Sequence, residues 1–148
     1  MVTYPVKLLI PDMNWEYVSN QRVIELFQDK MYITLIKDVK DFRGDFCYNF
    51  ALGVGDDKVD DCESGHAFLE TLYEPIPIKK AKVGDVISYY DGFPGEDTCQ
   101  HFAIIEETDR TLSGTFILSK WGAWGVFLTD LYAMPDFYGD TIVIWRKK

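Results

Sequence analysis

The chain has 148 residues, of which 47% are hydrophobic and 16% are aromatic. This composition fits a globular domain with a full hydrophobic core and excludes a disordered or low-complexity protein. The formal net charge of −9 disfavours direct binding to nucleic acid or to an anionic membrane, because both depend on surface Lys and Arg.

The first half of the chain is predicted to be mainly helical. The expected elements are an extended arm over 2–10, a helix over 14–27 with a cap at Ser19 or Asn20, a strand over 31–37, and helices over 46–52 and 63–72. Asp45 and Gly53 are suited to cap the helix over 46–52. Pro75 and Pro77 are expected to end the last helix.

The second half changes to a pattern typical of strands separated by turns. The expected strands cover 86–90, 101–106, 115–120, 126–128 and 141–145. Helices followed by a run of strands indicate an α+β fold, with N-terminal helices packed on a C-terminal antiparallel sheet of about five strands. We expect a single domain over 1–148, with 1–43 as an N-terminal extension and 44–146 as the core.

The three cysteines, Cys47, Cys62 and Cys99, form no CxxC pair, so the sequence predicts neither a disulfide framework nor a zinc knuckle. We expect free thiols, no metal and no cofactor. No signal peptide is evident, and no apolar run approaches the roughly 20 residues that cross a bilayer. These features predict a cytoplasmic protein, for which action outside the cell would require delivery by phage lysis or a secretion machine.

Cys47 and His101 are the candidate nucleophile and general base. Cys47 is expected in the first turn of a helix, where the pKa of a thiol falls and the attacking thiolate forms more readily. His101 begins a strand, and a cysteine at a helix start facing a histidine on a sheet provides both groups. Ser119 on the next strand is the candidate that orients the imidazole, if the two strands pair as a hairpin. Strand alternation is expected to point Lys120 to the other face.

The motifs around these residues follow a set order along the chain. The cysteine is followed by Val83-Gly84-Asp85-Val86-Ile87, then by His101-Phe102-Ala103-Ile104-Ile105, and then by a strand with polar residues. This order resembles the NlpC and CHAP group of papain-like cysteine peptidases and amidases, in a little-characterised bacterial and phage branch.

The resemblance covers roughly residues 44–146. It implies a papain-like, NlpC-type fold with Cys47, His101 and Ser119 as the catalytic residues. The chain departs from that group at two places. It has Asp45-Phe46-Cys47-Tyr48 where Asp-Cys-Ser-Gly is usual, and Ser119 where His, Asn or Gln is common.

Other groupings of reactive side chains are weaker candidates. Cys99 and His101, two residues apart on one strand, are expected to share a face. Cys62 and His66, four apart on a helix, provide only two of the three or four ligands that zinc takes. The acidic run over 56–63 lacks the closing glutamate of a calcium loop and is interpreted as a solvated loop.

The leading interpretation is a cysteine hydrolase, a peptidase or amidase, acting on a peptide or amide substrate. Cys47 attacks the carbonyl, His101 takes and returns the proton, and backbone N–H groups at the helix start hold the oxyanion. The alternative is a catalytically inactive or repurposed scaffold of the same type that acts as an acidic protein-binding factor, such as a phage or bacterial effector or inhibitor. Neither interpretation involves nucleic acid or a membrane.

Overall fold

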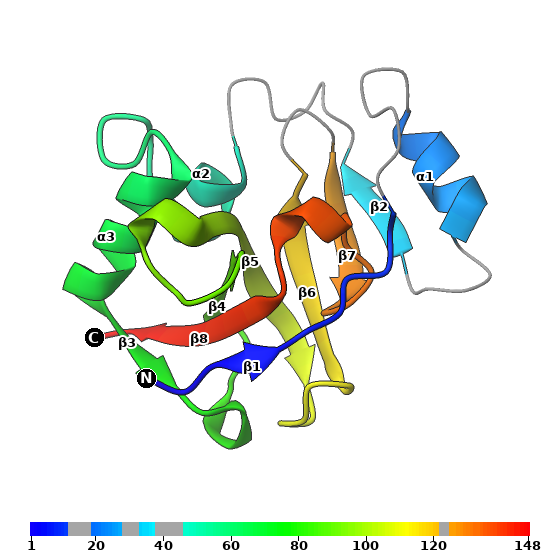
Figure 1. The fold of residues 1–148 in the computed structure, drawn as a ribbon. Helices are drawn as coiled ribbons and strands as arrows, with labels where there is room; N and C mark the ends of the chain where they lie inside the picture. The colour runs from blue at the N-terminus through cyan, green and yellow to red at the C-terminus, as the bar shows by residue number, and fades with distance from the viewer. Residues whose placement is uncertain (12–18, 28–32, 38–45, 122–124) are drawn as a thin grey trace.

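The computed structural model describes residues 1–11, 19–27, 33–37, 46–121 and 125–148, which contain one large antiparallel sheet and three α-helices (Figure 1). The strands are β1 (Tyr4–Pro5), β2 (Ile33–Lys37), β3 (Tyr73–Ile76), β4 (Val86–Tyr90), β5 (Cys99–Thr108), β6 (Thr115–Lys120), β7 (Val126–Asp130) and β8 (Thr141–Lys147). The α-helices are α1 (Asn20–Phe27), α2 (Cys47–Leu52) and α3 (Cys62–Leu72), and the short 3-10 helices are η3 (Ile78–Lys80), η4 (Glu96–Thr98) and η5 (Asp136–Tyr138).

The described strands follow the order β1-β8-β4-β5-β6-β7-β2, and β3 also pairs with β8. Strand β8 has β4 along one side, and β1 and β3 lie one after the other along its other side. The centre of the sheet is therefore built from chain segments that are close in sequence, β4 to β7. The edges are supplied by segments from the first half of the chain.

Both faces of the sheet are buried. The face under α2 and α3 carries Val86, Tyr90, Phe102, Val143 and Trp145, which form one core with residues of the two helices. The opposite face carries Ile87, Tyr89, Ala103, Ile105, Ile117, Phe127, Ile142 and Ile144, which form the second core. All five residues of β4 are buried, because neighbouring side chains on a strand point to opposite faces and each face here meets a core.

Helices α2 and α3 owe their ends to local side-chain contacts. Asp61 caps α3 by accepting the N–H of Ser64 at 2.6 Å, and the Ser64 hydroxyl accepts the N–H of Asp61 at 3.2 Å. Helix α2 ends at Gly53, whose φ of 66° lies in the left-handed region. The Asn49 side chain accepts the N–H of Phe46 at 3.2 Å, which closes the start of α2.

Most of the predicted elements are confirmed. The strands over 86–90 and 115–120 have the predicted bounds, and the other three predicted strands lie inside β5, β7 and β8. The helices around 46–52 and 63–72 correspond to α2 and α3. Ser19 accepts the N–H of Arg22 at 3.1 Å, as expected of a cap for α1. The predicted segments over 14–18 and 31–32 and the predicted cap Asp45 lie outside the described residues.

The predicted fold class is wrong. The described residues form a sheet of eight strands with only short helices, instead of N-terminal helices packed on a five-stranded sheet, and this corrects the papain-like, NlpC-type arrangement as well. The first half of the chain contributes β1, β2 and β3 to the sheet. None of the described helices is long and apolar enough to cross a membrane.

The physical reason for the error lies in the edge strands. Strand β3 contains Pro75, which had been expected only to end the preceding helix. An edge strand tolerates proline because one side of its backbone makes no ladder hydrogen bond. Strand β1 is two residues long, and its pairing with Thr141–Ile142 is set by distant sequence rather than by a local pattern.

Gly139 links η5 to β8 and provides a test of this connection. It has a φ of 114°, and a Cβ atom at this position would overlap the backbone carbonyl of Tyr90. Gly53 is a matched control, because it also has a positive φ but a Cβ atom there would meet open space. We expect Gly139→Ala to lower the free energy of unfolding by about 3 kcal/mol or more. Gly53→Ala should cost about 1 kcal/mol. Equal losses in urea denaturation would contradict the close approach at Gly139.

Candidate functional site

Cys47 is the first residue of α2, which confirms the predicted helix start. Its side chain is 7% exposed. Helix α2 packs against β5 and β6, the two strands that carry His101 and Ser119. The Nδ2 of Asn49 donates to the carbonyls of Val54 and Val59, both at 3.1 Å, which fixes this short helix to the segment that follows it.

His101 lies on β5 opposite Tyr89 and is fully buried. Burial lowers the pKa of His101 to about 3, because the apolar surroundings disfavour the charged imidazolium. The imidazole is therefore neutral at physiological pH. Among the described residues, neither Nδ1 nor Nε2 has a hydrogen-bond partner. A neutral imidazole in this situation keeps one nitrogen lone pair free to accept a proton.

Tyr138 packs against His101. Its ring stacks face to face on the imidazole, with centroids 3.9 Å apart and planes 8° from parallel. Burial raises the pKa of Tyr138 well above its usual value, and the sulfurs of Cys47 and Cys62 raise it further. Cys47 belongs to the core under α2 and α3, whereas His101 lies on the opposite face of the sheet with Tyr89. No hydrogen bond joins them in the described part of the chain.

Ser119 faces the same side of the sheet as His101, but its hydroxyl is engaged elsewhere. It accepts the indole N–H of Trp121 at 3.1 Å and lies 3.9 Å from the sulfur of Met134. The predicted hairpin of β5 and β6 is confirmed. Its register pairs Ile104 with Leu118, which places Ser119 opposite Ala103 rather than opposite His101. Lys120 is also buried and, by strand alternation, points to the other face.

The expected shared face of Cys99 and His101 is wrong. A β-bulge interrupts the pairing of β4 with β5, so that Cys99 lies opposite Tyr90 and His101 lies opposite Tyr89. Because Tyr89 and Tyr90 are consecutive, they point to opposite faces, and so do their partners. Burial is the main cause that raises the pKa of Cys99, which makes this thiol a poor nucleophile.

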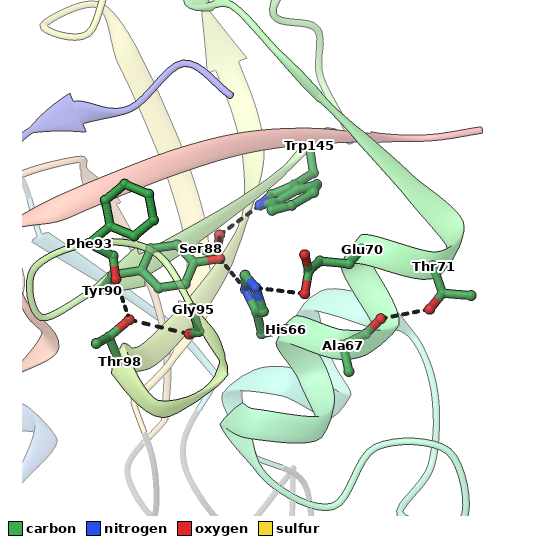
Figure 2. A network of polar contacts seen from close by, with 10 residues as sticks. All are labelled: His66, Ala67, Glu70, Thr71, Ser88, Tyr90, Phe93, Gly95, Thr98 and Trp145. Carbon is green, nitrogen blue, oxygen red and sulfur yellow. Dashed lines mark hydrogen bonds and ion pairs between the residues drawn. The ribbon is translucent and has the colours of Figure 1, made fainter.

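His66 lies at the centre of a buried chain of hydrogen bonds that the sequence analysis did not find (Figure 2). The Trp145 indole donates to Ser88 at 2.7 Å, and Ser88 donates to the Tyr90 hydroxyl at 2.8 Å. The Tyr90 hydroxyl lies 2.7 Å from Nδ1 of His66, and Nε2 of His66 lies 3.1 Å from the half-exposed Glu70 carboxylate.

The chain of hydrogen bonds has one consistent direction. An indole can only donate and a carboxylate can only accept, so each hydroxyl between them accepts from one neighbour and donates to the next. Tyr90 therefore donates to Nδ1 of His66, and Nε2–H donates to Glu70. Both ring nitrogens of His66 are therefore engaged in these contacts. Neither nitrogen is free to bind a metal ion together with Cys62. The described residues contain no group of three His, Cys, Asp or Glu side chains that could hold a metal ion.

Removal of the middle hydroxyl tests this chain of hydrogen bonds. We expect Ser88→Ala to lower the free energy of unfolding by about 1–3 kcal/mol, because it leaves the Trp145 N–H without an acceptor and removes the donor to Tyr90. The exposed Ser113 offers a control, for which the Ala variant should change stability by less than about 0.5 kcal/mol. Chemical denaturation measures both. A loss no larger at Ser88 than at Ser113 would show that the chain of hydrogen bonds contributes nothing.

The neutral, buried His101 makes stability depend on pH. Its pKa is about 3 in the folded protein and near 6.5 in an unfolded chain, so between these values the unfolded state binds a proton that the folded state does not. Stability should fall as the pH decreases from 6.5 toward 3, with a limiting slope of about 1.4 kcal/mol per pH unit from this residue. His101→Phe should remove that part of the slope. Carboxylates titrate in both proteins, so the difference between their unfolding free energies isolates His101. Parallel curves for the two proteins would mean that His101 is not buried as described.

Comparisons with known proteins give no relative. No protein family, no curated protein and no solved structure matches this chain. The case for a function therefore depends on the residues around Cys47, Tyr138 and His101.

Proposed function

We propose that this protein is a cysteine hydrolase, a peptidase or amidase, with Cys47 as nucleophile and His101 as general base. The observation that carries the proposal is the fully buried imidazole of His101, which stacks on Tyr138 and whose two nitrogens have no hydrogen-bond partner among the described residues. The order of the motifs along the chain, which resembles the NlpC and CHAP group, supports it independently.

The chemistry needs only groups of this chain and water. A ring nitrogen of His101 takes the thiol proton, and the Cys47 sulfur attacks the carbonyl carbon of the amide. The tetrahedral intermediate collapses with loss of the amine, to which the imidazolium returns the proton. Water, deprotonated by the same imidazole, then hydrolyses the thioester and frees the thiol and a carboxylic acid.

The two residues must approach each other for this chemistry. Burial keeps His101 neutral, but a thiolate beside it favours the imidazolium and so raises its pKa toward a useful range. Catalytic hydrogen bonds are often open without substrate and tighten in the complex. Because Ser119 is engaged with Trp121, the stacked ring of Tyr138 is the group that holds the plane of the imidazole.

Cys47→Ala tests the proposal. The wild-type protein should cleave at least one member of a panel of peptides, isopeptides, peptidoglycan stem peptides and simple amides, and should form a thioester adduct at Cys47 that mass spectrometry detects. The Ala variant should do neither, while its stability falls by only about 1–2 kcal/mol. Cys99→Ala is the matched control and should retain activity.

Iodoacetamide should alkylate Cys47 at least about tenfold faster than Cys99 at neutral pH. Equal alkylation rates with no cleavage of any substrate would refute the hydrolase.

A second candidate is an acidic protein-binding factor. It is favoured by the absence of a Cys47–His101 hydrogen bond among the described residues and by an acidic groove of about 290 Å³, whose lining includes Asp60, Glu63 and Glu96. A binder of this kind should keep its full effect in cells after Cys47→Ala and lose it after Glu63→Gln with Glu96→Gln.

A further inference from the structure

Two thiols begin two neighbouring helices. Cys47 is the first residue of α2 and Cys62 the first residue of α3, and both belong to the core under these helices. Figure 1 shows α2 and α3 next to each other, and the two helices are in contact. The segment between the two helices brings their first residues close together, so both thiols lie at the same corner of the molecule.

Hydrogen bonds from α2 to the segment before α3 hold this corner together. The Tyr48 hydroxyl donates to the carbonyl of Asp60 at 2.8 Å, and Asn49 donates to the carbonyl of Val59 at 3.1 Å. Tyr48 follows Cys47 directly, and Asp60 lies two residues before Cys62. The segment that follows Cys47 and the segment that precedes Cys62 are therefore held together by hydrogen bonds that do not involve the sulfurs.

The two thiols contact each other. The Cys62 thiol hydrogen-bonds with the Cys47 sulfur, and this contact, followed by burial, raises the pKa of Cys62. Cys62 thus keeps its proton and donates it to the Cys47 sulfur. Cys47 is buried and Cys62 is partly exposed, so solvent reaches the pair from the side of Cys62.

We propose that Cys47 and Cys62 form a peroxide-reactive pair that closes reversibly to an intramolecular disulfide. The disulfide follows from the arrangement of the two thiols alone. Its consequence, that oxidation blocks the nucleophile, rests on the proposed hydrolase. Cys99 does not take part, because it lies on β5 opposite Tyr90, with which it hydrogen-bonds.

Hydrogen peroxide is the oxidant in this scheme. The Cys47 thiolate attacks one peroxide oxygen, the O–O bond breaks, and Cys47 becomes a sulfenic acid while hydroxide leaves. The Cys62 sulfur then attacks the Cys47 sulfur, the S–O bond breaks, and the departing hydroxide takes the Cys62 proton as water. Overall, two thiols and one peroxide give one disulfide and two waters, and a dithiol reductant reverses the change.

Mass spectrometry of the full chain tests the pair. After treatment with one equivalent of hydrogen peroxide, the protein should lose the mass of two hydrogen atoms, and digestion without reductant should give a single cross-linked peptide containing Cys47 and Cys62. Dithiothreitol should restore the original mass and the alkylation of Cys47. Cys99→Ser should behave as wild type. Cys62→Ser should give no cross-link and should accumulate sulfinic acid at Cys47 at least about tenfold faster than wild type does.

The outcomes separate this pair from the hydrolase. A cross-link between Cys47 and Cys62 in a protein that cleaves no amide would support the thiol pair and refute the proposed function. Amide cleavage by a protein whose Cys47 oxidises to sulfinic acid equally fast with and without Cys62 would refute the thiol pair alone. A cross-link to Cys99 would also refute it. Thermal melting of Cys62→Ser and Cys99→Ser confirms that each variant is folded before oxidation.

Discussion

The sheet is buried on both faces along β4, and this constraint determines most of the remaining structure. Every side chain of β4 enters a core, so each polar group there needs a partner inside the protein. Ser88 and Tyr90 obtain theirs from Trp145 and His66, and the chain of hydrogen bonds reaches water only at Glu70. The position of α3 on the sheet is thereby fixed by direction-specific bonds in addition to apolar contact. Helix α2, which carries Cys47, is in turn attached to the segment that precedes α3.

In the proposed hydrolase, catalysis and oxidation use the same corner of the molecule. The sulfur proposed as the nucleophile accepts a hydrogen bond from a second thiol. A cysteine thiolate reacts with carbonyl carbon and with peroxide oxygen alike. A resolving thiol beside the nucleophile limits the damage, because a disulfide can be reduced whereas a sulfinic acid in general cannot.

Local sequence patterns predicted the helices and strands well. They did not predict which strands pair across long stretches of the chain. The strand over 86–90, the caps at Ser19 and Gly53 and the helix start at Cys47 depend on residues close in sequence, and all are present. The eight-stranded sheet depends on the pairing of β1 and β3 with β8. The sequence of β8 contains no pattern that identifies these two strands as its partners. A single bulge in β5 reversed the expected relation of Cys99 to His101. The chain of hydrogen bonds through His66 escaped notice because its members come from α3, β4 and β8.

His101 is the residue whose presence the fold alone does not explain. A fully buried imidazole without hydrogen-bond partners among the described residues costs about 1–3 kcal/mol relative to a paired one. A phenylalanine of similar size would fill the same space and stack on Tyr138 in the same way. Packing therefore favours an apolar ring at this position, whereas the chain places there the side chain best suited to move a proton near neutral pH. The proposed hydrolase gives the ring nitrogens a use, because its general base must take a proton from Cys47.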